Sequence, residues 1–392
     1  MIKTDVLIIG GGIIGCSIAY YLVKEGVKTV LVEKDDIASG ASGACDGFIF
    51  LQSKKSGIHL EMALKSAGIY ANLTAELGCD LEYRRCGGMI FAESQEELSY
   101  LCELSEKQQK NGLEVKILSE AETRSKVPGL ASHPRGATYC PQDAQVNPIL
   151  TTLALAGAAS KKGARIFTGT AISEMEVVGR RQGKGRIIAN SVAAKDKIKA
   201  DFVINAAGAE ASGIAGMAGF DLPIIPRRGQ ILVTEPLPKV LDCLLMSAGY
   251  LAAKFCRDDD MSIDCGVTLE QTAAGNILIG STREFVGYNK RTTYEGMTSI
   301  AANAIKFFPQ FKNFKIIRSF AGLRPYTPDG LPVLGYVNGI RNLIIASGHE
   351  GDGIALAPIT GKLVAELVVS GAASIDISEL SPNRFAAERQ QT

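Results

Sequence analysis

The sequence predicts a protein of mixed class, α/β plus α+β, in which a Rossmann-like dinucleotide-binding domain is interleaved with an antiparallel-sheet domain. Two observations carry this prediction. Continuous apolar segments, typical of strands buried on both faces, occur at the start, the middle and the end of the chain, at 4–9, 201–208 and 342–348. Between them lie alternating, turn-punctuated segments such as 227–235 and 275–284, which are typical of antiparallel strands with one solvated face.

The domain boundaries follow from that alternation. The predicted dinucleotide-binding domain is discontinuous and takes residues 1–85, 151–215 and 321–392. The second domain, expected to bind the substrate, takes residues 86–150 and 216–320. A chain of 392 residues is long enough to build a core in each domain. Helical periodicity, with apolar residues three or four positions apart, is visible at 13–25, 58–77, 94–111, 149–161 and 354–369.

The charge balance excludes several classes of function. The 42 basic residues nearly cancel the 41 acidic ones, so no excess charge is present to attract nucleic acid or anionic lipid. The apolar N-terminus carries Asp5 before the apolar run and three consecutive glycines within it, which favours a strand, a turn and a helix over a signal peptide. No other segment is apolar for 18 residues, so we expect no transmembrane segment.

The cysteines indicate where the protein works. There are nine, an odd number, and they are scattered, which argues against a disulfide framework and for a reducing, cytoplasmic location. Cys256 and Cys265 flank an acidic run at 258–260, but their spacing fits no zinc pattern, and we expect a surface loop there. We predict no metal site.

A phosphate-binding turn follows the first apolar segment. Residues 10–15 read GGGIIG, which matches G-x-G-x-x-G through Gly10, Gly12 and Gly15, and Glu33 ends the next strand 18 residues later. The glycines permit a tight turn and a close approach of the backbone to a pyrophosphate, while the helix N-terminus attracts its negative charge. Glu33 can accept hydrogen bonds from ribose hydroxyls. The alternative is a glycine turn in a βαβ unit that binds no ligand.

The segment that follows Glu33 suggests a long, permanently held cofactor. Residues 39–47, SGASGACDG, are small and polar and suit a second wrap of backbone around the pyrophosphate, although a plain loop has the same composition. Because the glycine motif occurs once, we expect one dinucleotide.

Arg324 raises a separate question. It is the only cation in GLRPYTPDGLPVLG, residues 322–335, and an unpaired guanidinium is costly to bury. Its negative partner could be Asp329 of the same segment, which would make the pair structural. It could instead be the carboxylate of a ligand.

The ordered set of motifs resembles one flavoprotein family. DVLIIGGGIIG, SGASGA, YCPQDAQVNP, DFVINAAGA, PRRGQ, GLRPYTPDGLPVLG and SGHEGDGIALAP together make the chain similar to D-amino-acid oxidase, glycine oxidase and sarcosine oxidase. The resemblance implies an FAD domain interleaved with an antiparallel substrate domain. It also implies oxidation of an amine or amino acid to an imine by hydride transfer to flavin N5.

The resemblance assigns residues to the cofactor and the substrate. It implies that the backbone of Ile172 contacts the adenine, that Ala206 and Gly208 lie against the adenosine and pyrophosphate, and that 349–354 borders the isoalloxazine ring. There the helix N-terminus would point at the flavin edge that becomes negative on reduction. His349 reads equally well as a flavin neighbour or as a buried, satisfied imidazole; His59 and His133 read as ordinary. The residues predicted to bind FAD are Gly10, Gly12, Ile13, Ile14, Gly15, Glu33, Lys34, Ser39, Ala41, Ser42, Gly47, Ile172, Ala206, Gly208, Gly322, Arg324, His349, Glu350, Gly351, Asp352, Gly353 and Ile354.

The substrate contacts are predicted to be Phe48, Tyr250 and Arg324, and Arg324 is the predicted catalytic residue. The resemblance places its guanidinium over the flavin, where its paired N–H donors match a substrate carboxylate.

Three departures from the family pattern refine these expectations. Gly351 stands where glycine oxidase-like chains carry an arginine, which argues against a small-amino-acid oxidase. No cysteine occurs in 322–329, so FAD should be held noncovalently, and Glu210 replaces a frequent tryptophan. The segment 347–367 is most like flavoprotein subunits of hydroxyproline and opine dehydrogenases and of hydrogen cyanide synthase, which work with partner subunits.

These expectations lead to one preferred function and three alternatives. The preferred function is FAD-dependent oxidation of an amino or imino acid that is hydroxyproline-, sarcosine-, glycine- or opine-like, in the catalytic subunit of a hetero-oligomeric dehydrogenase. The first alternative is an oxidase that passes electrons to oxygen and releases hydrogen peroxide. An FAD-bearing electron-relay or scaffold subunit and an NAD-dependent dehydrogenase are the others.

Overall fold

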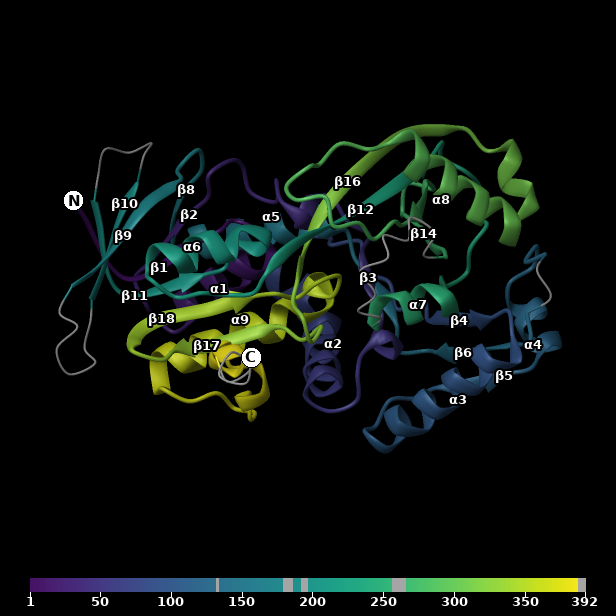
Figure 1. Ribbon diagram of the computed structural model, residues 1–392, viewed down its shortest axis with the longest axis horizontal. Helices are drawn as coiled ribbons and strands as arrows, with labels where there is room; N and C mark the ends of the chain where they lie inside the picture. Colours follow the sequence, from purple (N-terminus) through teal and green to yellow (C-terminus); the bar gives the residue numbers. More distant parts are fainter. Residues whose placement is uncertain (132–133, 179–185, 192–196, 256–265, 387–392) are drawn as a thin grey trace.

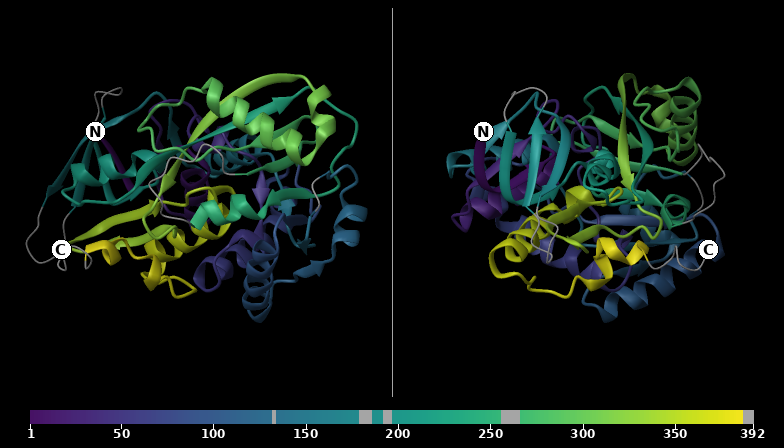
Figure 2. Two further views of the ribbon diagram at one scale, coloured as in Figure 1. Left: turned by 45° about the vertical axis from the view of Figure 1, so that its right-hand side comes forward. Right: turned by 60° about the vertical axis from the view of Figure 1, so that its left-hand side comes forward.

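The computed structural model describes residues 1–131, 134–178, 186–191, 197–255 and 266–386. Two large sheets, each covered by its own helices, form the two halves of the molecule (Figure 1). The N-terminal strand and helix, coloured purple, and the C-terminal helix, coloured yellow, belong to the same half (Figure 2, left). The first half is therefore built from segments far apart in the sequence, as the recurring buried strands predict.

The first sheet is mainly parallel. Strand β1 (Ile2–Ile9) pairs in parallel with β11 from Ile2 opposite Ile198 to Ile9 opposite Asn205, and on its other side with β2. Its core strands alternate between two apolar clusters, one on each face of the sheet, so both faces need cover. The order is β17 (Val333–Val337), β18 (Ile340–Ser347), β11 (Lys197–Asn205), β1, β2 (Thr29–Val32) and β8 (Arg165–Phe167), with β9 (Ile172–Val178) and β10 (Arg186–Ser191) attached antiparallel beside β11.

Helices cover both faces of this sheet. The helices on one face are α1 (Ile13–Lys24), α2 (Ile58–Leu77), α5 (Pro148–Lys161) and α9 (Gly353–Ser370), and the short α6 (Ala211–Met217) lies on the other. Helices α1 and α9 pack closely, because the hydroxyl of Ser17 donates to the carbonyl of Ala357 at 2.8 Å and a side chain at Gly361 would collide with Ser17. Helix α9 is long and apolar enough to meet a length-and-composition criterion for a membrane span, but 67% of it is buried, as in the core helix of a soluble protein.

Pro358 lies inside α9 and removes one helical hydrogen bond, since proline has no N–H. The carbonyl that loses its partner is that of Ile354, four residues earlier. The hydroxyl of Tyr70 on α2 donates to this carbonyl at 2.6 Å and so satisfies it. The start of α9 is thereby fixed to α2.

The second sheet is mainly antiparallel and carries the other half of the molecule. Its strands, in order, are β16 (Ile316–Tyr326), β12 (Ile225–Thr234), β15 (Ile277–Gly280), β14 (Thr268–Gln271), β13 (Leu244–Ser247), β4 (Gly88–Ala92), β6 (Gly136–Cys140) and β5 (Lys116–Leu118). Its helices are α3 (Gln95–Lys110), α4 (Glu120–Lys126), α7 (Ala248–Phe255) and α8 (Tyr294–Phe307). The small β3 (Phe48–Ile49) and β7 (Ala144–Gln145) pair apart from both sheets. Short 3₁₀ helices are η1 (Ala41–Gly43), η2 (Leu51–Ser53), η4 (Gly208–Glu210), η5 (Pro309–Asn313), η6 (Ser378–Leu380) and η7 (Pro382–Ala386).

The predicted elements lie close to those observed, but three predicted domain boundaries fall inside observed elements. The helix expected at 58–77 is α2, and the one expected at 149–161 is α5. The boundary between 150 and 151 falls inside α5, and that between 215 and 216 falls inside α6. The boundary drawn between 320 and 321 falls inside β16, because that strand pairs with β12 as far as Tyr326 opposite Ile225. The division of the chain into two domains otherwise stays a prediction.

Candidate active site

The phosphate-binding turn has the geometry that its sequence predicts. Gly10 has a φ of +115°, and a β-carbon there would collide with the carbonyl of Ala206, so only glycine fits. A β-carbon at Gly15 would collide with the carbonyl of Gly10. Because glycine has no β-carbon, α1 can lie close to the turn. Helix α1 starts at Ile13 without a capping side chain from Gly12, and its first turn has no acidic residue. Its N-terminus therefore suits an anion.

Glu33 lies at the end of β2 and fixes the turn from the opposite side. One carboxylate oxygen accepts from the N–H of Gly11 at 2.6 Å, and the other accepts from the N–H of Asp35 at 2.9 Å. The hydroxyl of Ser42, from the segment predicted to wrap the pyrophosphate, accepts from the N–H of Ile13 at 3.0 Å. The two glycine-rich segments thus lie against each other at one end of a long cavity.

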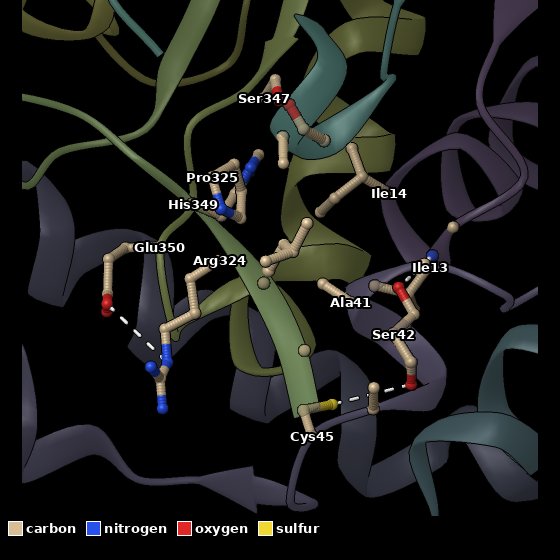
Figure 3. Close-up of a pocket in the computed structure, with 18 of the residues that line it drawn as sticks. Ile13, Ile14, Ala41, Ser42, Cys45, Arg324, Pro325, Ser347, His349 and Glu350 are labelled. Carbon is tan, nitrogen blue, oxygen red and sulfur yellow. Dashed lines mark hydrogen bonds and ion pairs between the residues drawn. The ribbon is translucent and has the colours of Figure 1, made fainter. Parts of the chain in front are cut away.

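The other end of the cavity is built from charged side chains. Arg324 and Glu350 lie on one side of the cavity, while Ile13, Ile14 and Ser42 lie on the other, with Cys45 next to Ser42 (Figure 3). Arg324 is 14% exposed at its side chain. Its guanidinium donates to the hydroxyl of Ser281 at 2.7 Å and to the carbonyl of Thr282 at 3.0 Å.

Arg324 is not paired with Asp329, so that alternative is wrong. Asp329 binds Arg384 instead, with Arg384 Nε 2.7 Å from Asp329 Oδ2. The carboxylate near Arg324 is Glu350, whose Oε1 lies 3.9 Å from Arg324 Nε. A β-carbon at Gly229 would collide with the guanidinium, so the glycine on the neighbouring strand makes room for Arg324.

Glu350 is buried among three arginines. It forms ion pairs with Arg227 and with Arg283 Nη1, the latter at 2.9 Å from its Oε1. Burial opposes its charged form, but Arg283, Arg227 and Arg324 outweigh that cost and hold the pKa of Glu350 well below its usual range. Its φ of +50° is a left-handed conformation, which a residue with a side chain adopts at a cost of about 1–3 kcal/mol.

Asp352 is the centre of a second buried charge cluster, directly before α9. Lys54 Nζ lies 2.7 Å from its Oδ1 and Lys254 Nζ lies 2.8 Å from its Oδ2, while His59 Nε2 lies 3.2 Å from Oδ2. Burial opposes the charge, yet Lys254 and Lys54 keep the pKa of Asp352 well below its usual range. Burial lowers the pKa of Lys254 to about 8, although Asp352 acts in the opposite direction. His59, expected to be ordinary, belongs to this cluster.

His349 is buried as one of its readings expects, but only one of its two ring nitrogens has a hydrogen-bond partner among the described residues. It lines the cavity, yet it is 3% exposed and its Nε2 lies 3.1 Å from the hydroxyl of Thr360. Burial lowers the pKa of His349 to about 3, so its imidazole is neutral. His133 and the segment 256–265 lie outside the described residues.

The cavity collects most of the predicted site residues. Gly15 and Gly47 do not line it: Gly15 packs α1 against the turn, and the N–H of Gly47 donates to Glu270 at 2.7 Å. The predicted residues that line it are Gly10, Gly12, Ile13, Ile14, Glu33, Lys34, Ser39, Ala41, Ser42, Phe48, Ile172, Ala206, Gly208, Tyr250, Gly322, Arg324, His349, Glu350, Gly351, Asp352, Gly353 and Ile354.

Sequence reasoning missed several charged residues of the cavity. These are Asp46, Lys54, Lys254 and Arg283, with Arg227 directly behind them. Asp46 belongs to the glycine-rich segment 39–47, where only its charge stands out. Lys54 and Lys254 carried no sequence signal, because nothing in the chain order shows that both reach Asp352. Within the described part of the chain, no cluster of side chains is suited to a metal ion, and seven cysteines are free thiols.

Comparisons with known proteins match nearly the whole chain. A model of the DAO family, described as FAD dependent oxidoreductase, matches residues 5–367. A subunit of opine oxidase from Rhizobium meliloti is 30% identical, with 100% of both chains covered. The crystal structure of glycine oxidase from Geobacillus kaustophilus has a TM-score of 0.88 at 27% identity, covering 98% of this chain and 99% of the other. That of L-proline dehydrogenase from P. horikoshii has a TM-score of 0.89 at 27% identity, covering 99% of each.

The cavity fits a long dinucleotide such as FAD. Small residues and a helix N-terminus without an acidic residue in its first turn line the phosphate end, where a β-carbon at Gly12 would lie 3.1 Å from the hydroxyl of Ser42. From there the cavity continues without interruption to Gly351 and Gly353, at the N-terminus of α9. A phosphate group can therefore bind at the N-terminus of α1, and a flat, polar ring can lie against the glycines at the N-terminus of α9.

Proposed function

The chain belongs to the FAD dependent oxidoreductase family named DAO, and on that premise we propose that it oxidises the C–N bond of an amino or imino acid to an imine. The family, the fold class and the FAD cofactor predicted from the sequence are confirmed by the comparisons. The protein is a FAD-dependent amino-acid oxidoreductase. The proposed substrates are hydroxyproline-, sarcosine-, glycine- or opine-like acids.

Arg324 carries the proposal that the substrate has a carboxylate. Its guanidinium borders the cavity and makes three hydrogen bonds, from Nη1 to the carbonyl of Thr282 and from Nη2 to the hydroxyls of Ser281 and, at 3.4 Å, Tyr250. Each terminal nitrogen carries two N–H groups, so one donor remains on Nη1 for a carboxylate. A carboxylate can also replace the long bond from Nη2 to Tyr250, whose hydroxyl lines the same cavity. An electron-relay subunit would have no use for such an anion site, which argues against that alternative.

The chain's own residues bind, orient and enclose the substrate. FAD supplies the acceptor of a hydride from the substrate carbon when it is bound. Arg324 holds the carboxylate and thereby sets the direction in which the Cα–H bond points. Apolar side chains of Phe48, Ile231 and Met246 line the same end of the cavity and limit the access of water. The N-terminus of α9 presents partial positive charge where negative charge develops.

We expect FAD to be held noncovalently. Among the described residues, Cys45 is the cysteine that lines the cavity, and burial raises the pKa of its thiol well above the usual range, so it is a poor nucleophile. The purified protein should be yellow, and acid should release the flavin into the supernatant. Flavin that stays with the precipitated polypeptide would contradict this expectation.

The electron acceptor and a partner subunit form the finer part of the proposal. Likeness to a subunit of opine oxidase supports a role as one subunit of a larger enzyme. We propose that this enzyme is a hetero-oligomeric dehydrogenase in the cytoplasm. Likeness to glycine oxidase supports the second candidate, an oxidase that produces hydrogen peroxide. The isolated chain should reduce artificial dyes much faster than oxygen and should gain activity or stability from a co-expressed partner. Stoichiometric hydrogen peroxide at high turnover would establish the oxidase instead.

Anaerobic bleaching of the flavin tests the substrate class. The panel contains glycine, sarcosine, both hydroxyproline enantiomers and opines. At least one acid should bleach the flavin, and Arg324→Lys should lower kcat/KM for it at least tenfold, which is about 1.4 kcal/mol of transition-state stabilisation. Arg324→Ala should lower it further. Arg384→Lys is the matched control, because Arg384 pairs with Asp329 outside the cavity. Near-normal kcat/KM in Arg324→Ala would refute the carboxylate role.

A further inference from the structure

Asp46 is a carboxylate of the cavity that neither the phosphate turn nor the substrate-carboxylate site explains. It lines the same cavity as Arg324 and is partly buried. Among the described residues, no cation lies within ion-pair distance of it, unlike Glu350 and Asp352. A partly buried carboxylate without an ion pair is costly, so a cation or N–H donor that enters the cavity would be stabilised there.

The segments that carry Asp46 and Arg324 touch. A β-carbon at Gly322 would collide with the carbonyl of Ala44, so strand β16 packs directly onto the segment that carries Asp46. Asp46 and Arg324 each lie two residues from this contact in the sequence, and both line the cavity. Two further contacts fix the segment that carries Asp46. The N–H of Gly47 donates to Glu270 at 2.7 Å, and Phe48 pairs with Gln145 in the β3–β7 ladder.

We infer that Asp46 binds the amine side of the substrate while Arg324 binds its carboxylate. An α-amino or α-imino acid carries its nitrogen and its carboxylate on one carbon, so the two partners must be neighbours of opposite charge. Asp46 and Arg324 meet that requirement. This inference rests on the proposed function and adds the group that distinguishes an amino acid from a plain carboxylic acid.

The charges around Asp46 and Arg324 are consistent with Asp46 binding the amine and Arg324 binding the carboxylate. Burial raises the pKa of Asp46, and Arg324, a hydrogen bond from the backbone of Phe48, Arg283 and Lys54 oppose that shift. Burial, helped by the nearby Asp46, raises the pKa of Glu270 to about 8, so Glu270 keeps its proton at neutral pH and leaves the negative charge to Asp46. In a substrate that is bound with its amine neutral, the nitrogen lone pair forms the C=N bond as a hydride leaves Cα with both electrons of its C–H bond, and the nitrogen becomes positive. Asp46 stabilises that charge.

Two ligands that cannot be oxidised test the inference through binding. Pyrrole-2-carboxylate presents an N–H donor beside its carboxylate, whereas furan-2-carboxylate has the same shape with an oxygen acceptor in that place. Dissociation constants are measured on the FAD-loaded protein from the change in flavin absorption. The wild type should bind the pyrrole at least tenfold more tightly, because the N–H donates to Asp46 and the furan oxygen is repelled by it.

The variants separate the two anchors. Asp46→Asn keeps an acceptor for a neighbouring N–H and should reduce the preference for the pyrrole, while Asp46→Ala should reduce it to within about twofold. Glu270→Gln is the matched control: it changes the adjacent carboxyl, keeps the acceptor for Gly47 and should leave the preference unchanged. Arg324→Lys should weaken both ligands equally.

The outcomes distinguish this inference from the function on which it rests. A wild type that binds both ligands equally, or binds neither while an amino acid still bleaches its flavin, overturns the role of Asp46 alone. So does a preference that survives in both Asp46 variants. A wild type that binds neither ligand and is bleached by no acid of the panel overturns the proposed function and the inference together.

Discussion

The two ends of the cavity are built in different ways. The phosphate end is made of backbone and small residues that lie close together in the sequence, with Gly10, Gly12 and Ser42 within 33 positions. The substrate end is made of charged side chains from 46 to 352, gathered around Glu350 and Asp352. The first end recognises a group common to all dinucleotides, whereas the second selects one substrate. Shape and backbone suffice for the first task, and the second needs side-chain charge.

The two ends also differ in what a single change should do. At the phosphate end, a substitution should act mainly by steric exclusion of the cofactor. At the substrate end, buried charges balance one another, so removing one leaves its partners uncompensated in a medium that solvates them poorly. The predictions below test this difference.

The largest effect is expected from Glu350→Gln. Removing this charge leaves Arg227 and Arg283 buried without their carboxylate, and breaking a buried pair costs about 3–5 kcal/mol. Thermal unfolding with excess FAD should show a large fall in Tm or a protein that does not fold. Asp329→Asn is the control. It breaks the more exposed pair with Arg384 and should cost about 1 kcal/mol or less. Equal losses would mean that burial of the charges is not what matters.

At the phosphate end, Gly10→Ala should abolish or greatly reduce FAD binding. Its φ of +115° disfavours a side chain, and the new methyl group would collide with the carbonyl of Ala206, which displaces the turn. The measurement is the flavin-to-protein absorbance ratio after purification. Gly26→Ala is matched to it, because Gly26 also has a positive φ, of +75°, but nothing lies within 4 Å of the new carbon. That control should keep its FAD.

Gly229→Ala should damage the substrate end without touching a charge. The added methyl group would collide with the guanidinium of Arg324 and move it away from the substrate carboxylate. We expect kcat/KM to fall at least tenfold, about 1.4 kcal/mol, while the flavin content stays normal. Gly157→Ala, on α5 with open space around it, should leave kcat/KM unchanged. Normal kinetics in Gly229→Ala would show that the position of Arg324 is not critical.

The last prediction concerns pH. Burial raises the pKa of Glu270 from 4.5 to about 8, so between these values the folded protein holds a proton that the unfolded chain releases. The contribution of Glu270 to stability is therefore complete below pH 4.5 and declines as the pH rises towards 8. Glu270→Gln cannot ionise and should lose less Tm between about pH 6 and pH 9 than the wild type. Parallel Tm curves for the two proteins would falsify the raised pKa.

Much of the phosphate end could be predicted because its chemistry is local. A glycine with positive φ, a second glycine at the helix start and an acid at the next strand end occur at fixed spacings, and each spacing follows from the geometry of one βαβ unit. The interleaved fold was also visible, since buried and half-buried strands differ in their hydrophobic periodicity. The family resemblance added the position of Arg324 in the cavity, which its own segment left open between Asp329 and a ligand.

The sequence alone thus determined the fold class, the dinucleotide turn and a set of candidate contacts, because these depend on periodicity and short spacings. Only the tertiary structure decided which charges meet. Asp329 pairs with Arg384 rather than Arg324, and Lys54 and Lys254, 200 positions apart, share Asp352. Asp46 and Arg324 line one cavity, and Gly322 lets the two segments that carry them touch. Ion pairs form between side chains that are close in space. Tertiary packing brings these side chains together, and the sequence of each segment does not reveal which partner it will meet.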